Sequence, residues 1–221
     1  LAWWSLPMIA GGVAAFPITG NDWQNDFIVA GVGSAVRVGI MSAMWQGARV
    51  FGGRKPLWTA IFVPPAILVG LCLIPAFMQS MTARVVVVSI AQGAFCALAA
   101  YELWRGRAEE LPSRRMTIVI FLSFAMLMAV RVAGVRLMPF PMGALPMESA
   151  WLGGFALAMF VHAVFLGLLF IALTKERLEL QQRNITLIDP LTGLLNRRAL
   201  TAQIERKSRH LSHGPQQNAL L

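Results

Sequence analysis

The chain has 221 residues, of which 57% are hydrophobic and 13% are charged, and its formal net charge is +9. A soluble domain carries about 25% charged residues, so this composition excludes an ordinary soluble enzyme and predicts a membrane protein. The positive charge does not indicate a nucleic-acid partner, because the basic residues lie mainly in loops between apolar segments. The chain starts at apolar Leu1 without the charged start of a signal peptide, so we expect a truncated N-terminus.

Six apolar segments are long enough, or nearly long enough, to cross a bilayer, which takes about 20 helical residues. The first is interrupted by Pro and Gly, and the third carries Pro64-Pro65 at its middle, where we expect a kink. We therefore predict an all-α fold, a polytopic bundle of about six transmembrane helices. The predicted spans are 1–18, 27–47, 57–78, 84–104, 116–137 and 151–173.

Basic loops alternate with loops that lack basic residues. The loops 48–56 and 105–115 contain Arg or Lys, whereas 19–26 and 138–150 contain acidic residues only and 79–83 is uncharged. Cytoplasmic loops are enriched in Lys and Arg. We therefore expect both ends of the chain on the cytoplasmic side of the membrane.

Three ionisable residues fall inside the predicted spans and are candidates for a sensory site. Arg37 and His162 lie at mid-depth, and Arg131 lies in the outer part of its span. No acidic residue is predicted at a depth that would neutralise Arg37. A charge inside a membrane is costly and often functional, so Arg37 with Arg131 or His162 is predicted to hold a small anionic or polar ligand or a lipid headgroup. The alternative is a structural Arg37 bonded to helix carbonyls and water. We predict no metal site.

The last predicted span continues through 174–188 without Gly or Pro. Ile171, Leu178 and Ile185 recur every seven residues, while the intervening seam positions Thr174, Gln181 and Ile188 are mostly polar. This spacing predicts a short coiled coil that forms a marginal homodimer. A plain amphipathic juxtamembrane helix is the alternative.

The stretch from Asp189 to Arg198 reads Asp-Pro-Leu-Thr-Gly-Leu-Leu-Asn-Arg-Arg. Asp189 and Pro190 suit the start of a helix or turn, Gly193 permits a turn, and Asn196 can cap a helix at about 197–211. The stretch resembles the opening signature of the GGDEF domain of diguanylate cyclases, written D-x-L-T-G-L-x-N-R-R. The matching residues are Asp189, Leu191, Thr192, Gly193, Leu194, Asn196, Arg197 and Arg198.

The resemblance implies a sensor domain at 1–173, a signalling helix at 174–188, and the truncated start of an α/β GGDEF domain at 189–221. It also implies a bacterial parent enzyme in the inner membrane that joins two GTP molecules into cyclic di-GMP, with Mg2+ or Mn2+. Because two output domains must meet, a homodimer through the signalling helix is expected.

The family's active-site turn is absent from these 221 residues, since no Gly-Gly-Asp/Glu-Glu-Phe sequence occurs. We therefore expect the chain to contain no catalytic residue and to bind no cofactor itself. Two alternatives stay open: a catalytically inactive GGDEF-type receptor or scaffold, and a small transporter-like or channel-like membrane protein.

Overall fold

The structure of the chain, a computed structural model, describes residues 2–15, 27–106, 109, 111–135 and 150–185. In these ranges every regular element is a helix and there is no strand, which agrees with the predicted helical membrane part. The chain divides into two compact units, Leu1–Leu173 and Thr174–Leu221. The elements are α1 (Ala2–Ala15), the π-helix η2 (Phe27–Val32), α2 (Gly33–Phe51), α3 (Trp58–Cys72), α4 (Pro75–Gln79), α5 (Met81–Arg105), α6 (Pro112–Ala133) and α7 (Ala150–Ile185).

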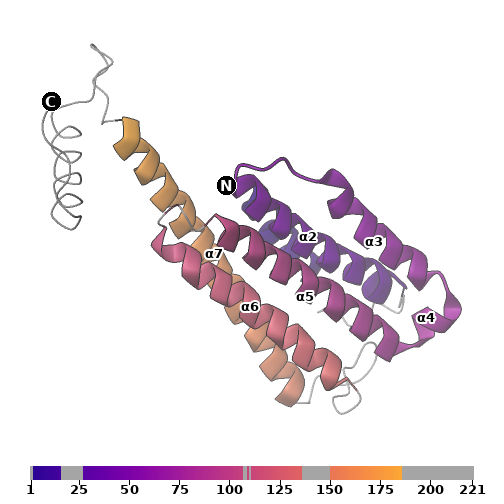
Figure 1. Cartoon of the computed structure of the whole chain (residues 1–221). Helices are drawn as coiled ribbons and strands as arrows, with labels where there is room; N and C mark the ends of the chain where they lie inside the picture. The colour runs from indigo at the N-terminus through magenta and orange to yellow at the C-terminus, as the bar shows by residue number, and fades with distance from the viewer. Residues whose placement is uncertain (1, 16–26, 107–108, 110, 136–149, 186–221) are drawn as a thin grey trace, which may run out of the picture. The chain divides into compact units, whose positions relative to one another are not determined.

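Helices α2 and α5 form the centre of the first unit (Figure 1). Helix α2 packs against α1, α3 and α5, and α5 packs against α2, α4 and α6. Buried Ala35, Leu68 and Val88 belong to one apolar cluster that joins α2, α3 and α5. At Gly93 of α5, an added Cβ would lie 3.3 Å from the Cβ of Met128. Glycine therefore lets α5 and α6 approach closely, as small residues do between membrane helices.

In the part of the chain that the structure describes, three helices are long and apolar enough to cross a membrane: α5, α6, and residues Gly153–Gln182 of α7. They correspond to the predicted spans 84–104, 116–137 and 151–173. The other predicted spans correspond to less typical helices. Helices α1 and α3 have 14 and 15 residues, and α2 contains polar Arg37, Gln46 and Arg49. The total of six spans stays a prediction.

The surface of the first unit is unusually apolar. Large exposed side chains include Phe62, Met126 and Phe160, which are 64%, 66% and 67% exposed. Among the three candidate spans, the most apolar is α7, and it is also the least buried, at 17% of its apolar window against 39% for α5. A soluble bundle turns its polar side chains outward. Here the most apolar helix is the most exposed, which indicates that lipid surrounds the helices.

The predicted span 57–78 is not one continuous helix, because α3 ends at Cys72 and α4 begins at Pro75. Ile74 lies directly before Pro75 and has a ψ angle of 116°, outside the helical range. The residue before a proline is driven away from the helical conformation by contact with the proline ring. Pro64 and Pro65, where a kink is predicted, both lie inside α3.

Helix α2 supports the two prolines of α3. Pro64 has no N–H, so the carbonyl of Ala60, four residues earlier, loses its usual helical donor. The hydroxyl of Ser42 donates to this carbonyl. The ring of Pro65 lies over Gly39, where an added Cβ would be 3.2 Å from the proline Cγ. A neighbouring helix thus supplies the donor that the proline removes, as membrane helices require.

Candidate functional site

Arg37 lies in the second turn of α2 and is half-buried. Its Nη2 donates to the Oγ of Ser34, one turn earlier, at 2.7 Å. Among the described residues this is the only hydrogen bond of the Arg37 side chain, and no described carboxylate forms an ion pair with it. Ser34 is neutral, so the bond orients the guanidinium group without compensating its charge.

Arg131, near the end of α6, is close enough to Arg37 for their like charges to interact. Its guanidinium carbon lies 4.9 Å from the ring centroid of Phe155 in α7. Two of the three predicted sensory residues, from helices α2 and α6, are therefore near enough for their charges to act on each other. Like charges disfavour each other, so a nearby anion would be favoured.

His162 has a different set of partners. Its Nδ1 lies 2.7 Å from the carbonyl oxygen of Ala158, and its Nε2 lies 3.0 Å from the Oγ of Ser123 in α6. The ring also meets Phe124 edge-on, with the centroids 5.7 Å apart. Both ring nitrogens are thus engaged at the contact between α6 and α7. His162 is placed as a link between these helices, and the two arginines form the candidate ligand-binding pair without it.

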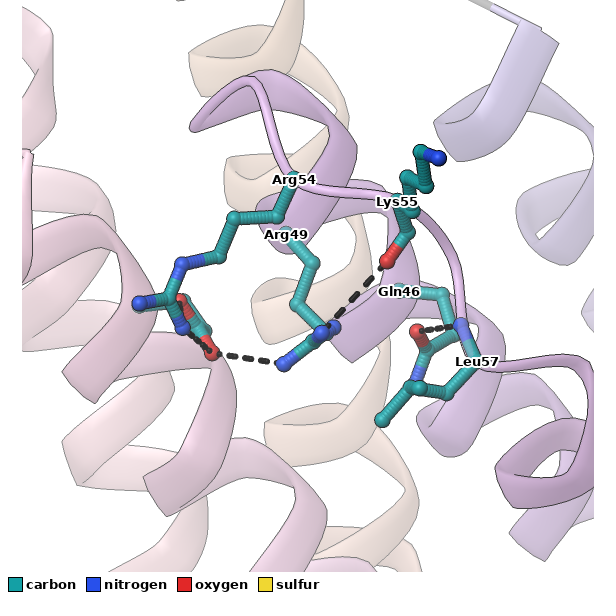
Figure 2. Close-up of polar contacts among 6 residues, drawn as sticks. Gln46, Arg49, Arg54, Lys55 and Leu57 are labelled. Atoms are coloured by element: carbon teal, nitrogen blue, oxygen red, sulfur yellow. Dashed lines mark hydrogen bonds and ion pairs between the residues drawn. The ribbon is translucent and has the colours of Figure 1, made fainter.

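A buried ionic cluster, which we call the Glu102 cluster, ties three elements together (Figure 2). The carboxylate of Glu102 in α5 is 7% exposed and lies 3.1 Å from Nη1 of Arg49 and 3.1 Å from Nη1 of Arg54. Arg49 belongs to the last turn of α2, and Arg54 to the loop before α3. Arg49 also donates to the backbone oxygen of Lys55 at 3.4 Å. The loop between α2 and α3 is therefore fixed to α5.

Two further contacts support this end of α2. The backbone N–H of Leu57 donates to the Oε1 of Gln46 at 2.8 Å (Figure 2), so the start of α3 is held by α2. Arg114, at the start of α6, forms an ion pair with Glu109 at 2.8 Å. Its guanidinium carbon lies 5.9 Å from the ring centroid of Phe51, the last residue of α2. The ends of α2, α5 and α6 are thus joined by charged groups.

From sequence, Arg49, Arg54 and Arg114 are loop charges that indicate membrane topology, and Glu102 is not among the predicted site residues. The signal was present, because Glu102 is the only acidic residue in the predicted span 84–104. The rule that singled out Arg37, that a charge inside a span needs an explanation, applies equally to Glu102.

The signature residues from Asp189 to Arg198 lie outside the described residues, as does the predicted helix at 197–211. The prediction of a GGDEF start therefore rests on sequence. Comparisons of the chain with protein-family models, with curated proteins and with solved structures find no match.

Proposed function

We propose that the chain is the membrane sensor portion of a diguanylate cyclase of the GGDEF family, which controls the synthesis of cyclic di-GMP from two GTP molecules. The match of Asp189–Arg198 to the family signature supports this proposal. The structural observation that carries it is that α7 is one helix from Ala150 to Ile185. A candidate membrane span and residues 174–185 of the segment before Asp189 therefore belong to one helix.

The proposed parent has three parts: a sensor domain at 1–173, a signalling helix at 174–188, and a GGDEF domain that starts at 189. The sensor crosses the bacterial inner membrane about six times, with both ends of the chain in the cytoplasm, where GTP is found. The alternation of basic and non-basic loops supports this orientation.

The proposed reaction requires two output domains. In each half-reaction a 3′-oxygen of one GTP attacks the α-phosphorus of the other, and pyrophosphate leaves as the new phosphate ester forms. Mg2+ or Mn2+ stabilises the charge that develops on the phosphate oxygens. Each subunit brings one GTP, so a homodimer through the signalling helix would set the distance between the two nucleotides.

The Arg37–Arg131 pair is the proposed sensory site, and its ligand would be a small anion or a lipid headgroup. Replacing Arg37 by Ala is expected to abolish the response of cyclase output to the ligand, because it removes the half-buried cation that no described carboxylate neutralises. The measurement is cyclic di-GMP formation by the parent with and without membrane extract. Arg115→Ala, which removes an exposed charge at the start of α6, is the matched control. An unchanged response in both Arg37→Ala and Arg131→Ala would remove the site from the proposal.

The function is tested by incubating membranes that contain the full-length parent with GTP and Mg2+ and measuring cyclic di-GMP by mass spectrometry. The expected result is synthesis that depends on the parent's GG(D/E)EF turn. GTP binding without synthesis would support the inactive receptor alternative. A parent without GTP binding or synthesis would contradict the GGDEF assignment and favour the transporter-like alternative.

A further inference from the structure

Arg84 is a buried cation that takes no part in the candidate site described above. It is the fourth residue of α5 and is 8% exposed. Its Nε is buried without a hydrogen-bond partner, and no described carboxylate forms an ion pair with it. Arg114, which is 4% exposed, has the carboxylate of Glu109 at 2.8 Å. A buried charge is costly unless it is paired, so Arg84 calls for an anionic partner that the described residues do not supply.

The N-terminal end of α5 adds positive potential around Arg84. The first turn of α5 contains no acidic residue, and a helix N-terminus carries a partial positive charge. The described carboxylate of α5 is Glu102, which lies 18 residues later, about 27 Å away by helix rise, and already binds two arginines. Side chains of an α-helix tilt toward its N-terminus, so the Arg84 side chain extends toward this end.

Backbone donors are present at the same end of α5. The N–H groups of Ala83 and Arg84 donate to the side chain and the backbone oxygen of Ser80, at 3.3 and 3.1 Å. For the N–H groups of Met81 and Thr82, no acceptor is found among the described residues. The first N–H groups of a helix have no partner within the helix and can bind an anion.

Two other segments lie at this end of α5. Cys72, the last residue of α3, is 3% exposed and is close enough to Arg84 for the guanidinium charge to act on its thiol. Cys72 also meets Gly31 of the π-helix η2, where an added Cβ would be 3.6 Å from the Cys72 Sγ. Short π-helical turns are rare and frequently occur at functional sites. A neutral thiol is only a weak acceptor, so Cys72 does not compensate the charge of Arg84.

The length of α5 relates Arg84 to the membrane surface. Near the other end of α5, Tyr101 and Trp104 stack with ring centroids 6.0 Å apart, and both are 49% exposed. The guanidinium carbon of Arg105 lies 5.6 Å from the Tyr101 ring centroid. Aromatic and basic side chains are enriched at membrane–water interfaces. Arg84 precedes Trp104 by 20 residues, about 30 Å of helix, which equals the thickness of the hydrocarbon layer, about 30 Å. A membrane-spanning α5 therefore places Arg84 near the opposite interface, at the level of the lipid phosphates.

We propose that Arg84 and the N-terminus of α5 form a binding site for an oxyanion of the phosphate class, carried by a lipid headgroup or free in solution. Arginine binds such groups through two parallel N–H···O bonds, and the backbone of the first turn supplies further donors. An anion bound beside Arg84 also limits access to the neighbouring Cys72 thiol. This site is independent of the proposed cyclase function and of the Arg37–Arg131 pair.

Cys72 provides a readout next to the site. In a Cys96→Ser background it is the only thiol of the chain. The purified chain is treated with a methanethiosulfonate reagent that carries either a sulfonate or a quaternary ammonium group, and mass spectrometry follows the labelling rate. The ratio of the anionic to the cationic rate is expected to fall severalfold in Arg84→Gln, because the attracting charge is lost. Arg115→Gln is the matched control and should keep the ratio, since Arg115 is the fourth residue of α6 and is exposed.

The ligand is tested first with Arg84 in place. Inorganic phosphate, phosphatidylglycerol or phosphate-free diacylglycerol is added at constant ionic strength, because salt screens charges. The expected result is slower Cys72 labelling and a higher midpoint of thermal unfolding with a phosphate compound. An effect of phosphatidylglycerol alone identifies a lipid headgroup, and an effect of inorganic phosphate identifies a free anion. Either effect should be lost in Arg84→Gln and kept in Arg115→Gln.

Three results would overturn the proposal. The first is that neither phosphate compound changes the labelling or the unfolding of the chain that retains Arg84. The second is that diacylglycerol acts as strongly as phosphatidylglycerol. The third is that Arg84→Gln and Arg115→Gln respond alike. The comparison of ligands needs no substitution at Arg84, so it decides the question even where Arg84→Gln does not fold.

Discussion

Ser42 shows how a single residue depends on another helix for its role. From sequence it is a polar residue in a moderately apolar segment, and nothing nearby along the chain explains it. Its partner is the Ala60 carbonyl, which lacks a helical donor because Pro64 follows four residues later. The proline was visible in the sequence, but which neighbouring side chain would face the freed carbonyl depends on how α2 packs against α3.

Replacing Ser42 by Ala is expected to lower the free energy of unfolding by about 1–2 kcal/mol, because it leaves the part-buried Ala60 carbonyl without a donor. Thermal unfolding in detergent measures the difference. Thr59→Ala, which removes an exposed hydroxyl one residue from Ala60, is the control and should unfold like the original chain. Equal stabilities of Ser42→Ala and Thr59→Ala would contradict the role assigned to the hydroxyl.

Gly47 is required by a neighbouring ring. An added Cβ would lie 2.3 Å from the indole of Trp4, which also stacks on Phe170. Gly47→Ala is therefore expected to push α1 away from α2 and to cost about 1–3 kcal/mol of stability, as overpacking does. Gly70→Ala is the control, since its Cβ would meet nothing within 4 Å. Tryptophan fluorescence during unfolding compares the two variants, and a Gly47→Ala protein as stable as Gly70→Ala would refute this packing.

For the candidate site residues, the sequence indicated that they lie within apolar spans, but it did not indicate which side chains they contact. It identified Arg37 as a charge within a span, and the structure gives it Ser34 on its own helix. It also grouped His162 with the arginines by depth. Depth alone does not specify which side of α7 a residue faces, and His162 faces Ser123 of α6, 39 positions away in the chain.

At the scale of elements, the Glu102 cluster determines how the end of α2, the following loop and α5 are held together. The carboxylate of Glu102 forms ion pairs with both Arg49 and Arg54. Its removal would therefore leave the two positive guanidinium groups near each other at a mostly buried position. Hydropathy could not predict this arrangement, because it assigns each segment a depth and does not pair one segment with another.

Glu102→Ala is expected to lower the free energy of unfolding by roughly 2–4 kcal/mol. Removing one partner of a buried ion pair leaves an uncompensated charge, but Arg54 is 36% exposed and solvent lessens its share of the effect. The control is Glu179→Ala, which breaks an exposed pair with Lys175 that contributes well under 1 kcal/mol. Denaturation in detergent that gave both variants the same midpoint would show that the cluster does not stabilise the fold.

At the scale of the whole molecule, hydropathy identified α5, α6 and α7 as membrane helices better than it identified α2. Helices α5, α6 and α7 follow the predicted apolar segments closely, since side chains that face lipid must be apolar along most of their length. Helix α2 contacts α1, α3 and α5 and can bury Ser34, Ser42 and Gln46 against them. The polar residues of α2 are tolerated because other helices surround it. A hydropathy scale measures transfer into lipid, so it cannot predict which helix is covered by protein.

Helix α7 has 36 residues without an internal proline, so it is about 54 Å long, whereas the hydrocarbon layer is about 30 Å thick. In a continuous helix, the direction that each residue faces around the axis depends on its number of residues from the start of the helix. Each residue inserted after Leu178 would turn whatever follows by about 100°, while seven inserted residues would restore the phase to within roughly 20°. If the proposed cyclase function holds, inserting one to seven alanines there should make the cyclic di-GMP output of the proposed parent rise and fall with the insert length and recover at seven. A smooth decline with length would mean that the helix acts only as a tether.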